Sequence, residues 1–107
     1  MSNYKLSHKH GSAIDHNDAK KWMKKYKEKH PDGIHAYFFG SEIIRKIIDH
    51  PEAVGMRVFL AYGDDDKTQM VLIGAREDGS SILPEGGKDS PGGTVGDTGT
   101  PCPPFCP

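Results

Sequence analysis

The chain has little cysteine and no long apolar segment. Its 107 residues include only two cysteines, Cys102 and Cys106, both close to the end of the sequence. A domain stapled throughout by disulfides is therefore excluded. The longest apolar runs, residues 58–61 and 70–73, are far too short to span a bilayer. Apolar residues make up 35% of the chain, which is low for a globular protein.

A secretory signal is also missing, because residues 1–13 are polar and hold no apolar stretch of the required length. We therefore predict a cytoplasmic protein, with a secreted and already processed chain as the alternative. The net charge of −1 is unevenly distributed: residues 1–50 carry ten Lys/Arg and six Asp/Glu, and residues 51–107 carry four and nine. Such a bipolar chain could attract copies of itself head to tail, although solvated faces are the plainer interpretation.

Composition divides the chain into three parts. Residues 1–14 are predicted to be a polar, His-containing arm, and residues 15–83 an α+β domain. Residues 84–107 form a Gly/Pro-rich tail with six prolines and six glycines, and such a segment cannot build a core of its own. The tail is therefore predicted either to be disordered or to lie along a surface.

Two amphipathic helices are predicted. The first is capped by Asp15 and ends near Lys29, because Pro31 cannot continue a helix. The second covers residues 42–49, with Ser41 as its cap. Both show one apolar stripe at helical spacing. The stripe residues are Ala19, Trp22, Met23 and Tyr26 in the first helix, and Ile43, Ile44, Ile47 and Ile48 in the second.

Alternating apolar residues predict strands at 54–62 and 68–75, joined into an antiparallel hairpin by a five-residue polar loop. Residues 34–39 and 80–83 are expected to add short strands. The predicted fold is α+β, with two helices packed on this small sheet and an extended C-terminal tail. Both hairpin faces are apolar, so we expect one to meet the helices and the other to need a cover from the tail or another subunit.

The cysteine pair has the spacing C-x₃-C. If the intervening Pro103 and Pro104 adopted polyproline II, the two Cα atoms would lie about 12 Å apart, whereas a disulfide needs roughly 4.4–6.8 Å. A bond within the tail therefore requires a tight turn at the prolines. The alternatives are free thiols, a bond to another chain, metal binding, or chemical modification.

Other candidate sites are weaker. His8, His10 and His16 could contribute to a metal site, but their spacing matches no metal motif and a flexible arm is preferred. We expect no cofactor and no bound metal. The Asp64-Asp65-Asp66 run lacks the glycine and glutamate of a calcium loop and is interpreted as a charged hairpin tip.

Neither nucleic acid nor a membrane is expected as a partner, since the lysine-rich first helix has no nucleic-acid motif beside it and the chain is nearly neutral. No nucleophile elbow, paired-carboxylate motif or phosphate loop is present in the sequence, so we predict that the protein is not an enzyme and has no catalytic residues. His35, within an aromatic strand, is interpreted as a packed or edge histidine.

A resemblance rests on four segments: residues 39–44, 54–58, 71–74 and the final Cys102-Pro103-Pro104-Phe105-Cys106. In these the chain resembles small uncharacterised bacterial proteins of about this length that end in Cys-Pro-Pro-x-Cys. The resemblance implies that the tail belongs to the protein, and it carries no catalytic residues with it.

The function expected from these features is a non-enzymatic interaction or self-assembly module. Its tail, with Phe105 as an anchor, would dock on a neighbouring subunit or partner and could form a homo-oligomeric ring or filament. One alternative is a metal- or redox-responsive protein that uses Cys102 and Cys106. The other is a precursor whose Cys/Pro tail is post-translationally modified. The candidate residues for tail docking or thiol chemistry are Cys102, Pro103, Pro104, Phe105 and Cys106.

Overall fold

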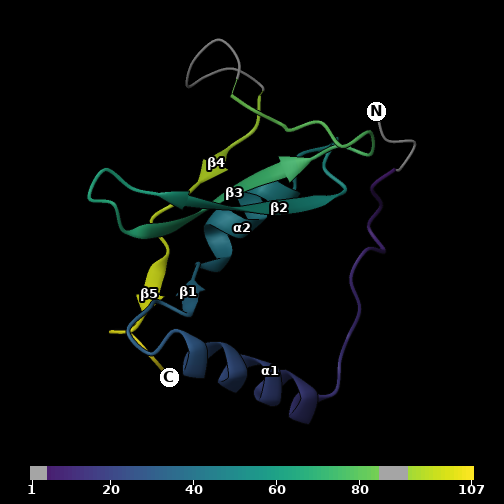
Figure 1. Cartoon of the computed structure of the whole chain (residues 1–107). Helices are drawn as coiled ribbons and strands as arrows, with labels where there is room; N and C mark the ends of the chain where they lie inside the picture. Colours follow the sequence, from purple (N-terminus) through teal and green to yellow (C-terminus); the bar gives the residue numbers. More distant parts are fainter. Residues whose placement is uncertain (1–4, 85–91) are drawn as a thin grey trace.

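The computed structural model describes residues 5–84 and 92–107, and within them it confirms the α+β class (Figure 1). This part of the chain contains two helices and five strands, and the last four strands follow the second helix. In order they are α1 (His16–Lys29), β1 (Ala36–Phe38), α2 (Ser41–Ile48), β2 (Gly55–Tyr62), β3 (Thr68–Ala75), β4 (Val95–Gly96) and β5 (Thr100–Cys102).

The strands form two small antiparallel sheets. β2, β3 and β4 make a three-stranded sheet in that order, and β1 pairs with β5 in a second sheet. The predicted hairpin is present, with its register running from Gly55 opposite Ala75 to Tyr62 opposite Thr68. The strand expected at residues 80–83 is reduced to a single bridge between Ala75 and Ser81.

Helix α2 provides the centre of the hydrophobic core. Gly40 is its N-cap and makes no side-chain hydrogen bond, so the prediction that Ser41 caps the helix was wrong; Ser41 is the first helical residue. Ile47 is only 2% exposed, whereas the neighbouring Ile48 is 42% exposed. The other buried apolar residues are Ala53, Leu72, Ala75, Ile82 and Cys102.

Helix α1 begins and ends where the sequence indicates. The Asp15 carboxylate accepts hydrogen bonds from the backbone N–H groups of Asn17 and Asp18, and His30 is the C-cap. None of the residues of α1 is buried, and Trp22 is 57% exposed. Figure 1 shows the helix lying below the hairpin rather than against it. The apolar stripe of α1 is therefore left uncovered by the described residues.

The described part of the tail is built into the domain. β4 extends the three-stranded sheet by pairing with β3, and β5 completes the second sheet by pairing with β1. Gly93 and Gly96 allow this close approach. A Cβ on Gly93 would lie 2.4 Å from the carbonyl oxygen of Ile82, and one on Gly96 would lie 2.9 Å from Ile43 Cγ1. Any larger residue at either position would push the tail outward.

The two faces of the hairpin differ in their surroundings. The face that carries Leu72 and Gly74 lies against α2, since Gly74 approaches Ile47. On the other face, Phe59 and Val95 are both more than one-third exposed. β4 lengthens the sheet at its edge and does not lie across this second face. The described residues of the tail therefore do not cover this second apolar face of the hairpin.

Tyr37 connects the two sheets, because its hydroxyl donates a hydrogen bond to the backbone carbonyl of Thr68. Burial raises the pKa of Tyr37, and the charge of Asp65 raises that pKa further. We expect Tyr37→Phe to lower the free energy of unfolding by about 1 kcal/mol at neutral pH, through loss of this bond. Urea denaturation followed by circular dichroism measures the change.

The same variant tests the raised pKa. Because the pKa of Tyr37 is higher in the folded protein, this tyrosine ionises at a lower pH in the unfolded chain. The contribution of Tyr37 to stability is therefore fully present below pH about 10 and decreases as the pH rises above that value. Tyr37→Phe should lose less stability over this alkaline range. An unchanged alkaline slope in the variant would contradict the assignment to Tyr37.

Candidate functional site

The described surface holds an open groove with a volume of about 1090 Å³. It lies between α1, β1, the tip half of the hairpin and the tail. Its walls are mainly apolar. Among the side chains that form them are Trp22, Met23 and Tyr26 from α1, Leu60 and Met70 from the hairpin, and Pro103 and Pro107 from the tail.

Positive charge borders this groove on the side of α1. Lys20, Lys24 and Lys27 contribute to its lining, with Glu28 as the acidic neighbour. These lysines lie on the same helix as the exposed apolar stripe. The groove therefore suits an occupant that combines apolar side chains with acidic groups.

The cysteine pair lies at the tail end of the groove and is joined in a disulfide, with the two Cα atoms 4.7 Å apart. The tight turn at the prolines that such a bond requires is present. The peptide bonds Cys102–Pro103 and Pro103–Pro104 are cis, and the Phe105 N–H donates a 3.0 Å hydrogen bond to the Pro101 carbonyl. Cys102 is 4% exposed, whereas Cys106 is exposed.

His35 lies directly beside the disulfide. Its Nε2 atom is 3.8 Å from Cys102 Sγ, and its backbone N–H donates a 2.9 Å hydrogen bond to the Cys102 carbonyl. Along the sequence, His35 and Cys102 are 67 positions apart. No spacing along the chain signals this contact, since it depends on the pairing of β1 with β5.

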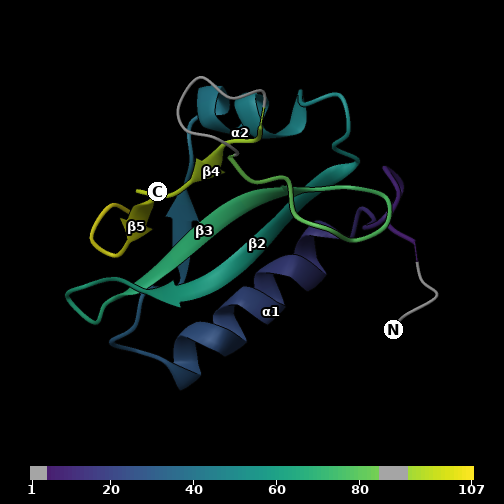
Figure 2. The same cartoon turned by 90° about the horizontal axis from the view of Figure 1, so that it is seen from above.

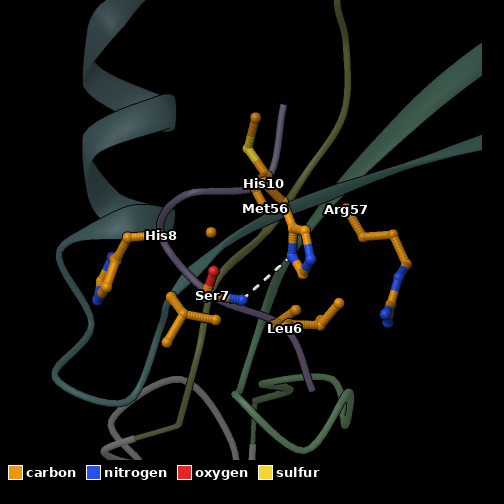
Figure 3. A pocket seen from close by; sticks show the side chains of 9 residues that line it. Leu6, Ser7, His8, His10, Met56 and Arg57 are labelled. Carbon is orange, nitrogen blue, oxygen red and sulfur yellow. Dashed lines mark hydrogen bonds between the residues drawn. The ribbon is translucent and has the colours of Figure 1, made fainter. Parts of the chain in front are cut away.

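The three N-terminal histidines lie elsewhere. His8 and His10 line a smaller pocket of about 290 Å³ beside Met56 and Arg57. The Ser7 N–H donates to His10 Nδ1, and the rings of His8 and His10 point apart (Figure 3). His16 is the first residue of α1. Within residues 5–84 and 92–107, the side chains grouped closely enough to share a metal ion are His35, Cys102 and Cys106.

The remaining tail residues of interest are at the surface. Pro103, Pro104 and Phe105 are all exposed, and Phe105 is 68% exposed. Asp64, Asp65 and Asp66 form an exposed acidic hairpin tip, in which Asp65 accepts a hydrogen bond from the Lys67 N–H. The structure thus places the acidic tip and the disulfide loop at separate points of the molecule.

Comparisons with protein families, with curated proteins and with solved structures found no match. Within the part of the chain that the structure describes, no helix combines the length and the apolar character needed to cross a membrane. The candidate site must therefore be interpreted from its own geometry and chemistry.

Proposed function

We propose that this chain is a non-enzymatic self-assembly module, in which a second copy adds its β2 strand to the free edge of β2 and occupies the adjoining groove. The observation that carries the proposal is the character of β2. It is an end strand of its sheet, eight residues long, and apolar on both faces. Its pairing partner in the described chain, β3, occupies one side only.

An exposed, long and apolar edge strand is a template for pairing with another chain, because its outward backbone N–H and C=O groups lack ladder partners. Natural proteins usually blunt such edges with charges, prolines or bulges. In β2 the only charged residue is Arg57, whose guanidinium donates to the Gly79 carbonyl. Leu60 is 76% exposed and Tyr62 is also exposed. Covering these side chains would stabilise a dimer.

Antiparallel pairing of two β2 strands is isologous, so it closes as a symmetric dimer. Figure 1 and Figure 2 together place α1 below the hairpin, on the far side of the groove from β2. A second copy paired at the β2 edge would border this groove, to which Trp22 of α1 and Leu60 of β2 both contribute. The acidic tip at Asp64, Asp65 and Asp66 and the lysine-rich α1 carry opposite charges, so any contact between them across the two copies would favour association.

Docking of the tail on a neighbouring subunit is a second mode of self-assembly, and it uses a different surface of the chain. β4 and β5 of the tail already pair with strands of their own chain, so residues 103–107 are the described segment that could contact a neighbour, with exposed Phe105 as the anchor. Such a contact is heterologous and would build rings or filaments. The assembly size separates the two forms, because edge pairing of β2 stops at two copies.

The test compares two leucine substitutions in the full chain by sedimentation equilibrium over a range of protein concentrations. The native sequence and Leu83→Lys should both form dimers, since Leu83 is exposed but lies outside the groove. Leu60→Lys should be monomeric, because lysine on an edge strand opposes pairing. A native chain that stays monomeric throughout, or a Leu60→Lys chain that dimerises as well as the native one, would refute edge pairing.

A further inference from the structure

His35, Cys102 and Cys106 form a cluster beside the groove whose side chains are typical metal ligands, although the two cysteines are joined in a disulfide. We propose that, once the Cys102–Cys106 bond is reduced, His35, Cys102 and Cys106 bind a soft divalent cation such as Zn²⁺ and leave one coordination position open. Thiolate and imidazole are the ligands that zinc prefers, and three protein ligands plus a water are typical of an open zinc site.

The distances fit tetrahedral coordination. With a Zn–N distance of about 2.05 Å and a Zn–S distance of about 2.3 Å, the N···S edge of a tetrahedron is about 3.6 Å. The distance from His35 Nε2 to Cys102 Sγ is 3.8 Å. One nitrogen and two sulfur atoms lie within 4.8 Å of one another. The two sulfurs need to separate only to the S···S edge of about 3.8 Å.

The backbone keeps these ligands together without the disulfide. The His35 N–H donates to the Cys102 carbonyl, and Ala36 is opposite Cys102 in the β1–β5 pair. The hydrogen bond from Phe105 to Pro101 closes the turn that brings Cys106 back toward Cys102. These main-chain bonds remain when the sulfur atoms part. The site is therefore largely formed before the metal arrives.

Burial and charge also favour a cation. Cys102 is nearly buried, so its thiolate would have little water around it and would need a positive partner. Two thiolates and a neutral imidazole neutralise the two charges of the ion. Cys106 is exposed and provides the side from which an ion can enter. The fourth ligand would be a water molecule on this open side.

The chemistry balances with a dithiol or phosphine as reductant. The reductant gives two electrons to the S–S bond and is itself oxidised, and with two protons from water the cysteines become thiols. Metal binding then releases those two protons to solvent, while His35 binds through Nε2 as the neutral imidazole. In the reverse direction, a disulfide oxidant takes two electrons from the thiolates and is reduced to two thiols with two protons from water, and the re-formed Cys102–Cys106 bond expels the ion. The disulfide and the metal are thus mutually exclusive states of one site.

The test uses the reduced full chain and Co²⁺ as the probe, because sulfur-to-cobalt charge-transfer bands report thiolate ligands directly. Reduced native protein should bind one Co²⁺ per chain with these bands, and Zn²⁺ should displace it. The oxidised protein should show no bands. His35→Gln should weaken binding by about tenfold or more, since even losing an outer hydrogen-bond partner of a metal ligand costs that much.

His30→Gln is the matched control, because His30 also lines the groove but lies outside the ligand cluster. It should bind Co²⁺ like the native chain. Circular dichroism shows whether each variant is folded, and Zn²⁺ should raise the thermal midpoint of the reduced native protein but not that of the oxidised one. Reduced protein without charge-transfer bands, or equal affinity in His35→Gln and the native chain, would overturn the site.

Discussion

Replacing Gly93 with alanine is expected to loosen the tail from the domain and to lower the free energy of unfolding by about 1–3 kcal/mol. The added Cβ would lie 2.4 Å from the carbonyl oxygen and 2.5 Å from the Cγ2 atom of Ile82. Ile82 is 1% exposed, so it has little room to move. The clash involves backbone, which no change of rotamer relieves. The Gly93 N–H bond to the Leu83 carbonyl, 3.1 Å long, would be strained as well.

Urea denaturation of the full chain measures the loss, and limited proteolysis shows whether the tail becomes accessible. Gly55→Ala is the control, because a Cβ there meets no atom within 4 Å. That substitution should leave stability unchanged or slightly improved. If Gly93→Ala unfolded at the native urea concentration and its tail resisted protease equally, the close approach of the tail to Ile82 would be wrong.

The substitution Ile47→Ala is expected to cost about 2–5 kcal/mol, the range for truncating a buried isoleucine. Ile47 is 2% exposed and fits between two glycines, Gly74 on β3 and Gly96 on β4. No larger side chain at those positions can move in to fill the space. A domain of this size is stable by only about 5–15 kcal/mol. The variant would therefore lose a large share of its stability.

Ile48→Ala provides a matched comparison within the same helix. Ile48 is 42% exposed, so truncating it removes less buried surface and leaves no enclosed cavity. Equilibrium unfolding monitored by helical circular dichroism should place its midpoint close to that of the native chain and well above that of Ile47→Ala. Similar losses in the two variants would contradict the position of Ile47 at the centre of the core.

Elements whose signals are local could be predicted from the sequence. Asp15 and Pro31 delimit α1, because a cap and a helix breaker act within a few residues. The hairpin follows from alternating apolar residues on both sides of a polar five-residue loop. The apolar stripe of α1 was also recognised, but amphipathic spacing says which face is apolar and not whether anything covers it. The exposure of Trp22 could not be foreseen.

The candidate site depends on contacts between distant parts of the chain, and these left no local signal. His35 meets Cys102 only because β5 pairs with β1. The glycines of the tail gave a composition typical of disorder. In the structure, Gly93 and Gly96 instead have a steric role against Ile82 and Ile43. A repeat of glycine at every third position, 93, 96 and 99, is the feature of the sequence that could have indicated a fitted segment.

The pairing of β1 with β5 has a consequence for the way this chain folds. β1 precedes every described element except α1, whereas its partner β5 follows all of them. His35 and Cys102 are therefore separated by 67 positions along the chain. Contacts of such high sequence separation slow folding, because a long loop must close before they contribute. On the ribosome, the hairpin and α2 can assemble while β1 is still unpaired. We therefore expect the second sheet to form after the hairpin and α2 have assembled.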